Sequence, residues 1–189
     1  MGTTDRKQEA KGFAEAKSEA AYNLRDLFEV GLKDIYSAEK ALMNTLPNMV
    51  ENASSPELAN TLKNHLTETK AHVSRLEEIF ESKGIKVVAV KSQAIEGLIN
   101  ESKDIIAKTE IGAVRDAGII ATGQKLKQYE IATYDALQSF AENLGENKAA
   151  SLLAMTLNEQ KKANASLKEI AQSNINFNAS GADAIENIQ

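Results

Sequence analysis

The sequence predicts an all-α protein, a four-helix bundle made of two helical hairpins joined by a long crossover with an extra short helix. Apolar residues recur three and four positions apart through most of the chain, as in amphipathic helices. The pattern repeats at an offset of 91 residues, which pairs Leu62 with Leu153 and Leu76 with Leu167. With 189 residues, 42% of them hydrophobic, the chain is long enough to fold as one domain.

The first hairpin is predicted from residues 22 to 84. Residues 22–53 form its first helix, and Pro47 inside that helix predicts a kink because proline removes one backbone hydrogen bond. Ser55 and Pro56 are a start signal, an N-cap followed by proline at the first helical position. The second helix therefore begins at once and should end at Gly84, since glycine suits the left-handed conformation at a helix C-terminus.

The second half begins with an extended connector at residues 85–92. A short amphipathic helix is predicted at 93–108, a long helix at 110–143 that Gly145 closes, and a last helix at 146–172. The domain thus spans residues 20–172. Residues 1–19 and 173–189 are expected to be mobile tails.

The composition excludes several classes of function. There is no cysteine, which removes disulfides, Cys-ligated metal clusters and thiol nucleophiles. The net charge is −5 and basic residues are scattered among acidic ones, which argues against a nucleic-acid partner. The first residues carry charges of both signs and no apolar run, which is unlike a signal peptide. No apolar run in the sequence has the length of a membrane span. We therefore expect a cytoplasmic protein with no membrane partner.

Four glutamates stand out because of their positions in the repeat. Glu39 and Glu68 pair with Glu130 and Glu159 at the same offset. Glu39, Glu130 and Glu159 lie within the apolar stripes of their helices, and Glu68 lies at the edge of its stripe. If all four point inward, their carboxylates meet near the middle of the bundle.

Buried carboxylates need partners, because an unpaired ionised carboxylate is costly to remove from water. No Lys or Arg stands out in the apolar stripes as that partner. Two divalent cations would balance four carboxylates, and oxygen-rich sites completed by imidazole suit iron or manganese. His65 and His72 flank Glu68, although each alone is more often an ordinary helix residue. A single Glu in a stripe is more often a surface residue, and duplication could repeat a structural glutamate.

Several sequence blocks resemble the YciF/YciE-like family of ferritin-like bacterial stress proteins. The similarity extends from about Leu24 to Ala171 and is specific because the blocks occur in order. The blocks are 32–40 (LKDIYSAEK), 46–47 (LP), 55–58 (SPEL), 65–69 (HLTET), 75–80 (RLEEIF), 96–99 (EGLI) and 129–132 (YEIA). The resemblance implies a ferritin-like bundle, a homodimer and a di-metal site, whereas the family's biochemical activity is poorly defined.

The chain departs from the wider ferritin-like pattern at the histidines. A Glu-x-x-His motif would place His at 71 and 162, where the sequence has Ala71 and Lys162. His72 is one residue late, so the expected site is lopsided, with Glu96 of the crossover helix as a further candidate ligand. Glu96 can equally be an ordinary surface charge.

The leading functional hypothesis is a di-iron or di-manganese stress protein that handles iron, oxygen or peroxide. Its chemistry would be non-haem redox, with a small-molecule oxidant as partner, although the sequence does not decide whether it is an enzyme. The candidate metal ligands are Glu39, Glu68, His72, Glu96, Glu130 and Glu159. The alternative is a non-enzymatic helical dimer scaffold without a functional metal site. Tyr36, Tyr129 and Tyr134 are core aromatics or hydrogen-bond donors to the ligands.

Overall fold

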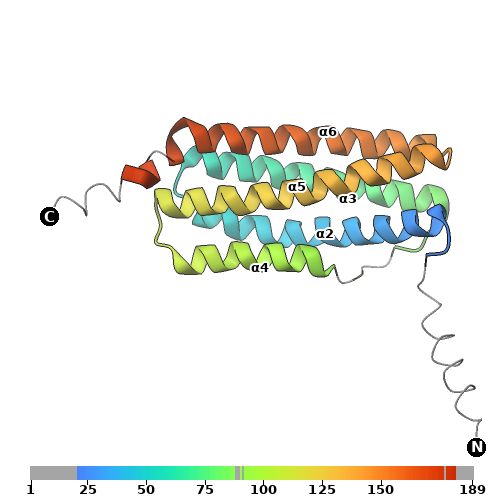
Figure 1. Ribbon diagram of the computed structural model, residues 1–189, viewed down its shortest axis with the longest axis horizontal. Coiled ribbons are helices and arrows are strands. Elements are labelled where there is room, and N and C mark those ends of the chain that lie inside the picture. Colours follow the sequence, from blue (N-terminus) through green and yellow to red (C-terminus); the bar gives the residue numbers. More distant parts are fainter. Residues whose placement is uncertain (1–20, 88–89, 91, 177, 182–189) are drawn as a thin grey trace, which may run out of the picture.

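The computed structural model describes residues 21–87, 90, 92–176 and 178–181, and among these it contains helices and no strand. The all-α prediction is confirmed. The long helices lie side by side along a common direction (Figure 1). The long helices are α2 (Leu24–Asn52), α3 (Pro56–Lys83), α5 (Ala113–Asn143) and α6 (Asn147–Ile170), and a shorter helix is α4 (Gln93–Lys108).

The helices pack in a closed ring. Helix α2 contacts α3, α3 contacts α6, α6 contacts α5, and α5 contacts α2. The short helix α4 lies outside this ring against α2 and α5. Consecutive long helices are therefore neighbours, as expected for two hairpins joined through α4.

Local signals decide where the helices end. Ser55 is the N-cap of α3 and its side chain accepts a hydrogen bond from the Leu58 amide, with Pro56 at the start of the helix. Gly84 ends α3 with a φ of 64°, a left-handed conformation that glycine adopts without strain. Helix α2 runs through Pro47 without a break. The predicted starts and stops of α3 are therefore confirmed.

The C-terminal boundary differs from the prediction. A π-helical segment, Ala171–Ile175, continues from α6, and the chain stays helical at 176 and 178–181. Ile175 is buried in the same apolar cluster as Leu58 and Ile170, which gives this segment a packing reason to remain helical. The chain therefore remains helical beyond residue 172, where the last helix was predicted to end. Residues 1–20 and 182–189, which include the predicted N-terminal tail, lie outside the described residues.

Each hairpin turn is tied to the other hairpin. At one end, buried Asp116 of α5 accepts hydrogen bonds from the Ser54 amide and hydroxyl and from the Ser55 amide, at 2.6 to 2.8 Å. Next to the turn between α5 and α6, Glu146 pairs with Arg25 of α2 and Lys83 of α3. The two hairpins are thus fastened at both turns.

The core has two apolar clusters with buried polar residues between them. One cluster contains Phe28, Phe80 and Tyr134, and the other contains Met49 and Ile170. On α3 the gap between the clusters holds three buried polar side chains, which are His65, Thr69 and His72. Within the described residues, no helix is both long and apolar enough to cross a membrane.

A buried charge cluster between the helices

Two of the four predicted glutamates meet inside the protein. Glu39 on α2 and Glu130 on α5 are both fully buried. The Nε2 amide of Gln160 on α6 donates to Oε1 of Glu130 at 2.9 Å and lies 3.3 Å from Oε1 of Glu39. The Tyr134 hydroxyl donates to the same Glu39 oxygen at 2.7 Å. These contacts link α2, α5 and α6 through side chains that the apolar stripes place at the core.

Lys127 supplies a positive charge to this cluster. It is 5% exposed, and its Nζ lies 3.0 Å from Oε2 of Glu130, one helical turn away. The same ammonium donates to Oε1 of Gln160 at 2.7 Å. Because that bond takes the amide oxygen, the amide nitrogen of Gln160 is directed at the two carboxylates.

His72 connects the interior to the surface. Its Nδ1 lies 3.2 Å from Oε1 of Glu39, and its Nε2 lies 3.0 Å from Oε2 of Glu159. Burial lowers the pKa of His72, but the hydrogen bond and charge of Glu39 and the charge of Glu130 outweigh it and raise the pKa above 6.5. The protonated ring has a donor for each carboxylate.

Glu159 is held at the edge of the cluster by Arg75. Both guanidinium nitrogens of Arg75 bind the carboxylate, at 2.6 and 2.8 Å, and the Glu159 side chain is 30% exposed. The Arg75 hydrogen bonds lower the pKa of Glu159, against a smaller effect of burial. Glu159 therefore contacts His72 from the solvent side and does not enter the centre.

The charges of the cluster balance. Glu39, Glu130 and Glu159 face Lys127, His72 and Arg75, three potential anions against three cations. Burial nevertheless raises the pKa of Glu130 to about 7; Lys127 opposes this shift and Glu39 adds to it. Near neutral pH this carboxyl is thus poised between its charged and neutral forms.

The expectation that no lysine or arginine neutralises these carboxylates is wrong. Lys127 follows Leu126 in the stripe and stands three residues before Glu130, a spacing that brings side chains together on one helix face. Gln160 was also missed, although it is seven residues after Leu153 and seven before Leu167 on the buried face of α6. Both could have been found by testing polar residues as members of the stripes.

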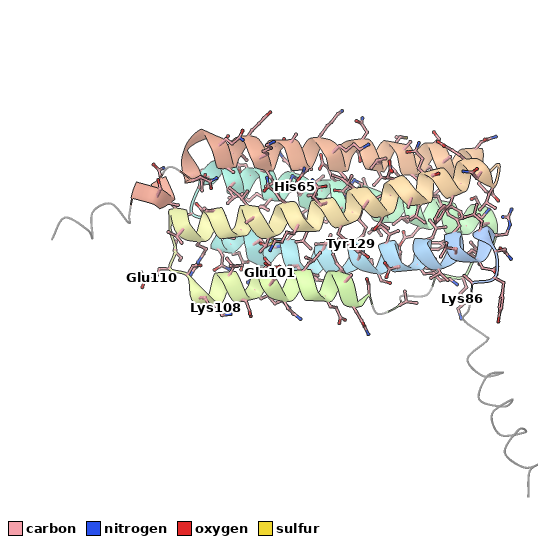
Figure 2. The ribbon with its side chains drawn as sticks, viewed as in Figure 1. His65, Lys86, Glu101, Lys108, Glu110 and Tyr129 are labelled. Carbon is pink, nitrogen blue, oxygen red and sulfur yellow. The ribbon has the colours of Figure 1, made fainter. Side chains whose placement is uncertain are left out.

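The remaining predicted ligands lie elsewhere. Glu68 is half-buried on α3, and its charge acts on Arg75 at the protein surface. Glu96 is half-buried on α4, where it lines a surface groove with Thr45 and Asn100. His65 is buried within the helices, whereas Glu110 lies outside them (Figure 2). Of the three tyrosines singled out in the sequence, Tyr134 donates to the predicted ligand Glu39. Tyr36 donates to Glu77 and Tyr129 donates to Asp34.

Comparison with known proteins identifies the family. Residues 23–180 match DUF892, a family described as a domain of unknown function. The chain belongs to the DUF892 family. Protein YciF of Escherichia coli (strain K12) is 40% identical over 157 residues, which cover 82% of this chain and 95% of that protein. The predicted YciF-like relationship is therefore confirmed.

Solved structures agree with this DUF892 assignment. The crystal structure of the E. coli stress protein YciF has a TM-score of 0.79 at 39% identity and covers 82% of this chain and 99% of that one. YcfI of Rhodopseudomonas palustris, whose description proposes a structural protein, has a TM-score of 0.77 at 38% identity, covering 80% and 96%. A Xanthomonas campestris protein with 18% identity, TM-score 0.67 and coverage of 85% and 98% shares the fold.

The side chains of this DUF892 protein, as arranged, do not fit two metal ions. Among the described residues, no group of three or more His, Asp or Glu side chains is placed to hold a metal. The space between Glu39, Glu130 and His72 is filled by the Gln160 amide nitrogen. Lys127 provides the counter-charge to Glu130 that a metal would otherwise supply.

The pKa values of the two histidines should be shifted in opposite directions, down for His65 and up for His72. Burial, followed by the charges of Lys127 and His72, lowers the pKa of His65 to about 3. Because these are the only histidines, side-chain NMR can follow both. We expect His65 to remain neutral at pH 5 and His72 to lose its proton at a higher pH than an ordinary histidine. A His65 signal that shifts midway near pH 6.5 would contradict the structure.

Proposed function

We propose that this protein is a non-enzymatic helical stress protein, with a ferritin-like four-helix bundle that serves as a homodimeric scaffold. The observation that supports this proposal is the closed charge cluster around Glu39 and Glu130. Lys127 and His72 balance the charges of these carboxylates from within the chain and Gln160 donates to both, so the fold needs no metal for charge balance. A role in stress accords with the name of the E. coli relative, and a structural role accords with that of the R. palustris relative.

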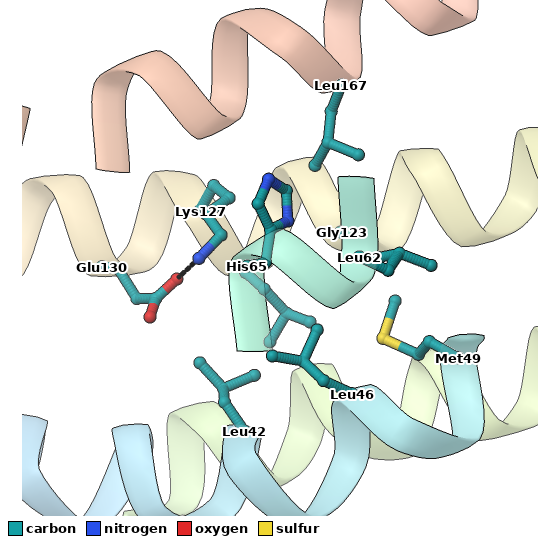
Figure 3. Close-up of a pocket in the computed structure, with 10 residues that line it drawn as sticks. Leu42, Leu46, Met49, Leu62, His65, Gly123, Lys127, Glu130 and Leu167 are labelled. Atoms are coloured by element: carbon teal, nitrogen blue, oxygen red, sulfur yellow. Dashed lines mark ion pairs between the residues drawn. The ribbon is translucent and has the colours of Figure 1, made fainter. Parts of the chain in front are cut away.

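The space beside the cluster also favours a scaffold over an enzyme. The cavity bordered by Glu130, Lys127 and His65 has a volume of about 10 Å³ (Figure 3). Pockets that bind small organic substrates are typically about 300–1,000 Å³. The charged groups at the centre therefore face no substrate-sized space in this arrangement.

The proposed homodimer would cover apolar side chains that remain exposed. Leu27 and Val30 lie one turn apart on α2 and are each nearly half exposed. Ile111, just before α5, and Val114, in its first turn, are also exposed. Symmetric dimers are the commonest closed assembly. Light scattering at micromolar concentration should report twice the chain mass of 20.5 kDa. A mass of one chain would remove the dimer from the proposal.

Metal content tests the scaffold proposal directly. Protein purified without chelator should contain well under one iron or manganese per chain, and added Fe(II) or Mn(II) should leave the melting temperature unchanged. About two ions per chain together with a higher melting temperature would overturn the proposal. That result would restore the di-metal reading, with Glu39, Glu68, Glu130 and Glu159 as ligands.

A second candidate is a site for one divalent iron or manganese ion. Glu39 Oε1, Glu130 Oε1 and His72 Nδ1 all lie within 3.3 Å of the Gln160 amide nitrogen. The other carboxylate oxygen of Glu39, Oε2, is buried without a hydrogen-bond partner. Because these three side chains as arranged are not placed to hold a metal, an ion would have to displace the amide and draw them closer together. It would then have two carboxylates and an imidazole as ligands, and would supply Lewis-acid or redox chemistry.

Two matched substitutions separate the candidates. Glu39→Gln removes a buried carboxylate of the one-ion site, and Glu68→Gln removes one that only the two-ion site needs. For a single site, we expect one ion per chain that is lost in Glu39→Gln and kept in Glu68→Gln. Loss in both variants would indicate two ions, and binding retained in both would show that the metal lies elsewhere.

A further inference from the structure

A small cavity lies where the two apolar clusters meet the charge cluster. Figure 3 shows it between α2, α3, α5 and α6, and every residue that borders it is buried. The lining residues are Leu42, Leu46, Met49, Leu62, His65, Gly123, Leu126, Lys127, Glu130 and Leu167. Its volume of about 10 Å³ is at the lower limit for holding one water molecule.

The polar wall of the cavity has unused hydrogen-bonding capacity. Oε2 of Glu130 is buried and, apart from the Lys127 ammonium 3.0 Å away, has no hydrogen-bond partner among the described residues, so it can accept a further hydrogen bond. That ammonium has three N–H groups, of which one binds Gln160 and another faces Glu130. His65 adds an imidazole to the same wall.

We propose that this cavity is a binding site for one structural water molecule, which donates to Glu130 Oε2 and accepts from the Lys127 ammonium. An apolar cavity of this size would stay dry, but a water with two or more polar partners is stably held. The ligand should be neutral, because Lys127 already balances Glu130 and an added cation would bring an unpaired charge into the core.

The proposed water would be a structural part of the charge cluster. It would complete the hydrogen bonding of Glu130, the carboxylate that is hardest to keep ionised in this environment. It would also separate the carboxylate from Leu46, Leu62 and Leu167 on the apolar wall. This role is independent of whether the protein acts as a scaffold or binds a metal.

Gly123→Ala is the substitution that tests the proposal. Gly123 lines the cavity, and a Cβ there would lie 3.3 Å from Leu167 Cδ1 and 4.0 Å from Met49 Cε, two other lining residues. Gly97→Ala is the matched control, because it adds the same methyl group to exposed α4 with no atom within 4 Å. Melting curves establish that both variants are folded.

Oxygen-17 magnetic relaxation dispersion counts long-lived buried waters in solution. We expect Gly123→Ala to lose one such water relative to the wild-type protein and Gly97→Ala to lose none. A crystal structure of the wild-type protein, at a resolution that shows ordered water, should have an oxygen between Glu130 and Lys127. An empty cavity in that map, or an unchanged water count in Gly123→Ala, would overturn the proposal.

Discussion

Replacing Lys127 with methionine should destabilise the protein by about 3–5 kcal/mol at pH 8, the range observed when one partner of a buried ion pair is removed. Methionine preserves most of the side-chain volume, so the effect isolates the ammonium. Without it, Glu130 and Glu39 remain as buried carboxylates and Gln160 loses the donor to its oxygen. Urea unfolding measures the difference in the free energy of unfolding, provided that this free energy falls with urea concentration equally steeply in both proteins.

Lys125→Met is the control for this substitution. Lys125 is two residues away on the same helix and pairs with Glu101 at the surface, where its side chain is 54% exposed. Exposed pairs of this kind contribute at most about 1 kcal/mol. If Lys127→Met were as stable as Lys125→Met at pH 8, Lys127 would not be the counter-ion of Glu130.

The wild-type protein should lose stability as the pH rises, and Glu130→Gln should lack the part of this loss that Glu130 causes. Because the pKa of Glu130 is raised from 4.5 to about 7 in the folded state, the folded protein holds more protons than the unfolded chain between these values. Stability therefore falls as the pH rises through this window, by about 3 kcal/mol for this group. His72, whose pKa is also raised, changes stability in the same direction.

The measurement compares the free energies of unfolding of wild type and Glu130→Gln at pH 5 and pH 8. The variant should lose less stability than wild type between pH 5 and pH 8, because only the wild-type carboxyl becomes ionised in the core. Glu142→Gln, an exposed position on the same helix, is the control and should follow the wild-type pH profile. Parallel profiles for all three proteins would contradict the raised pKa.

Features that depend on neighbouring residues were predictable from the sequence. The start of α3 at Ser55 and Pro56 and its end at Gly84 are set by local hydrogen bonding and backbone conformation. The burial of Glu39 and Glu130 follows from their place within regular apolar stripes. The continuation of helix beyond residue 172 was not predictable in this way, because it depends on the packing of Ile175 against distant residues.

The composition of the charge cluster depends on which partner reaches which carboxylate across helices. Glu68 and Glu159 have equivalent positions in the repeat, yet Arg75 holds Glu159 at the edge, and Glu68 stays on the surface of α3. Lys127 and Gln160 are buried polar residues on helix faces otherwise occupied by Leu. Lys and Gln are mostly exposed in proteins, so residue type alone predicts both on the surface. Only the packed arrangement shows that they bind each other.

The fastening of each hairpin turn to the opposite hairpin bears on how the protein opens. If the turn between α2 and α3 were released, the buried Asp116 carboxylate would lose its hydrogen-bond donors. If α5 and α6 separated from α2, the ion pairs of Glu146 would also break. Neither hairpin can then detach as a separate cooperative unit at low cost. In native-state hydrogen exchange, the slowest amides of α2, α3, α5 and α6 should share one opening free energy, equal to that of global unfolding, whereas α4, outside the ring, should exchange through smaller local openings.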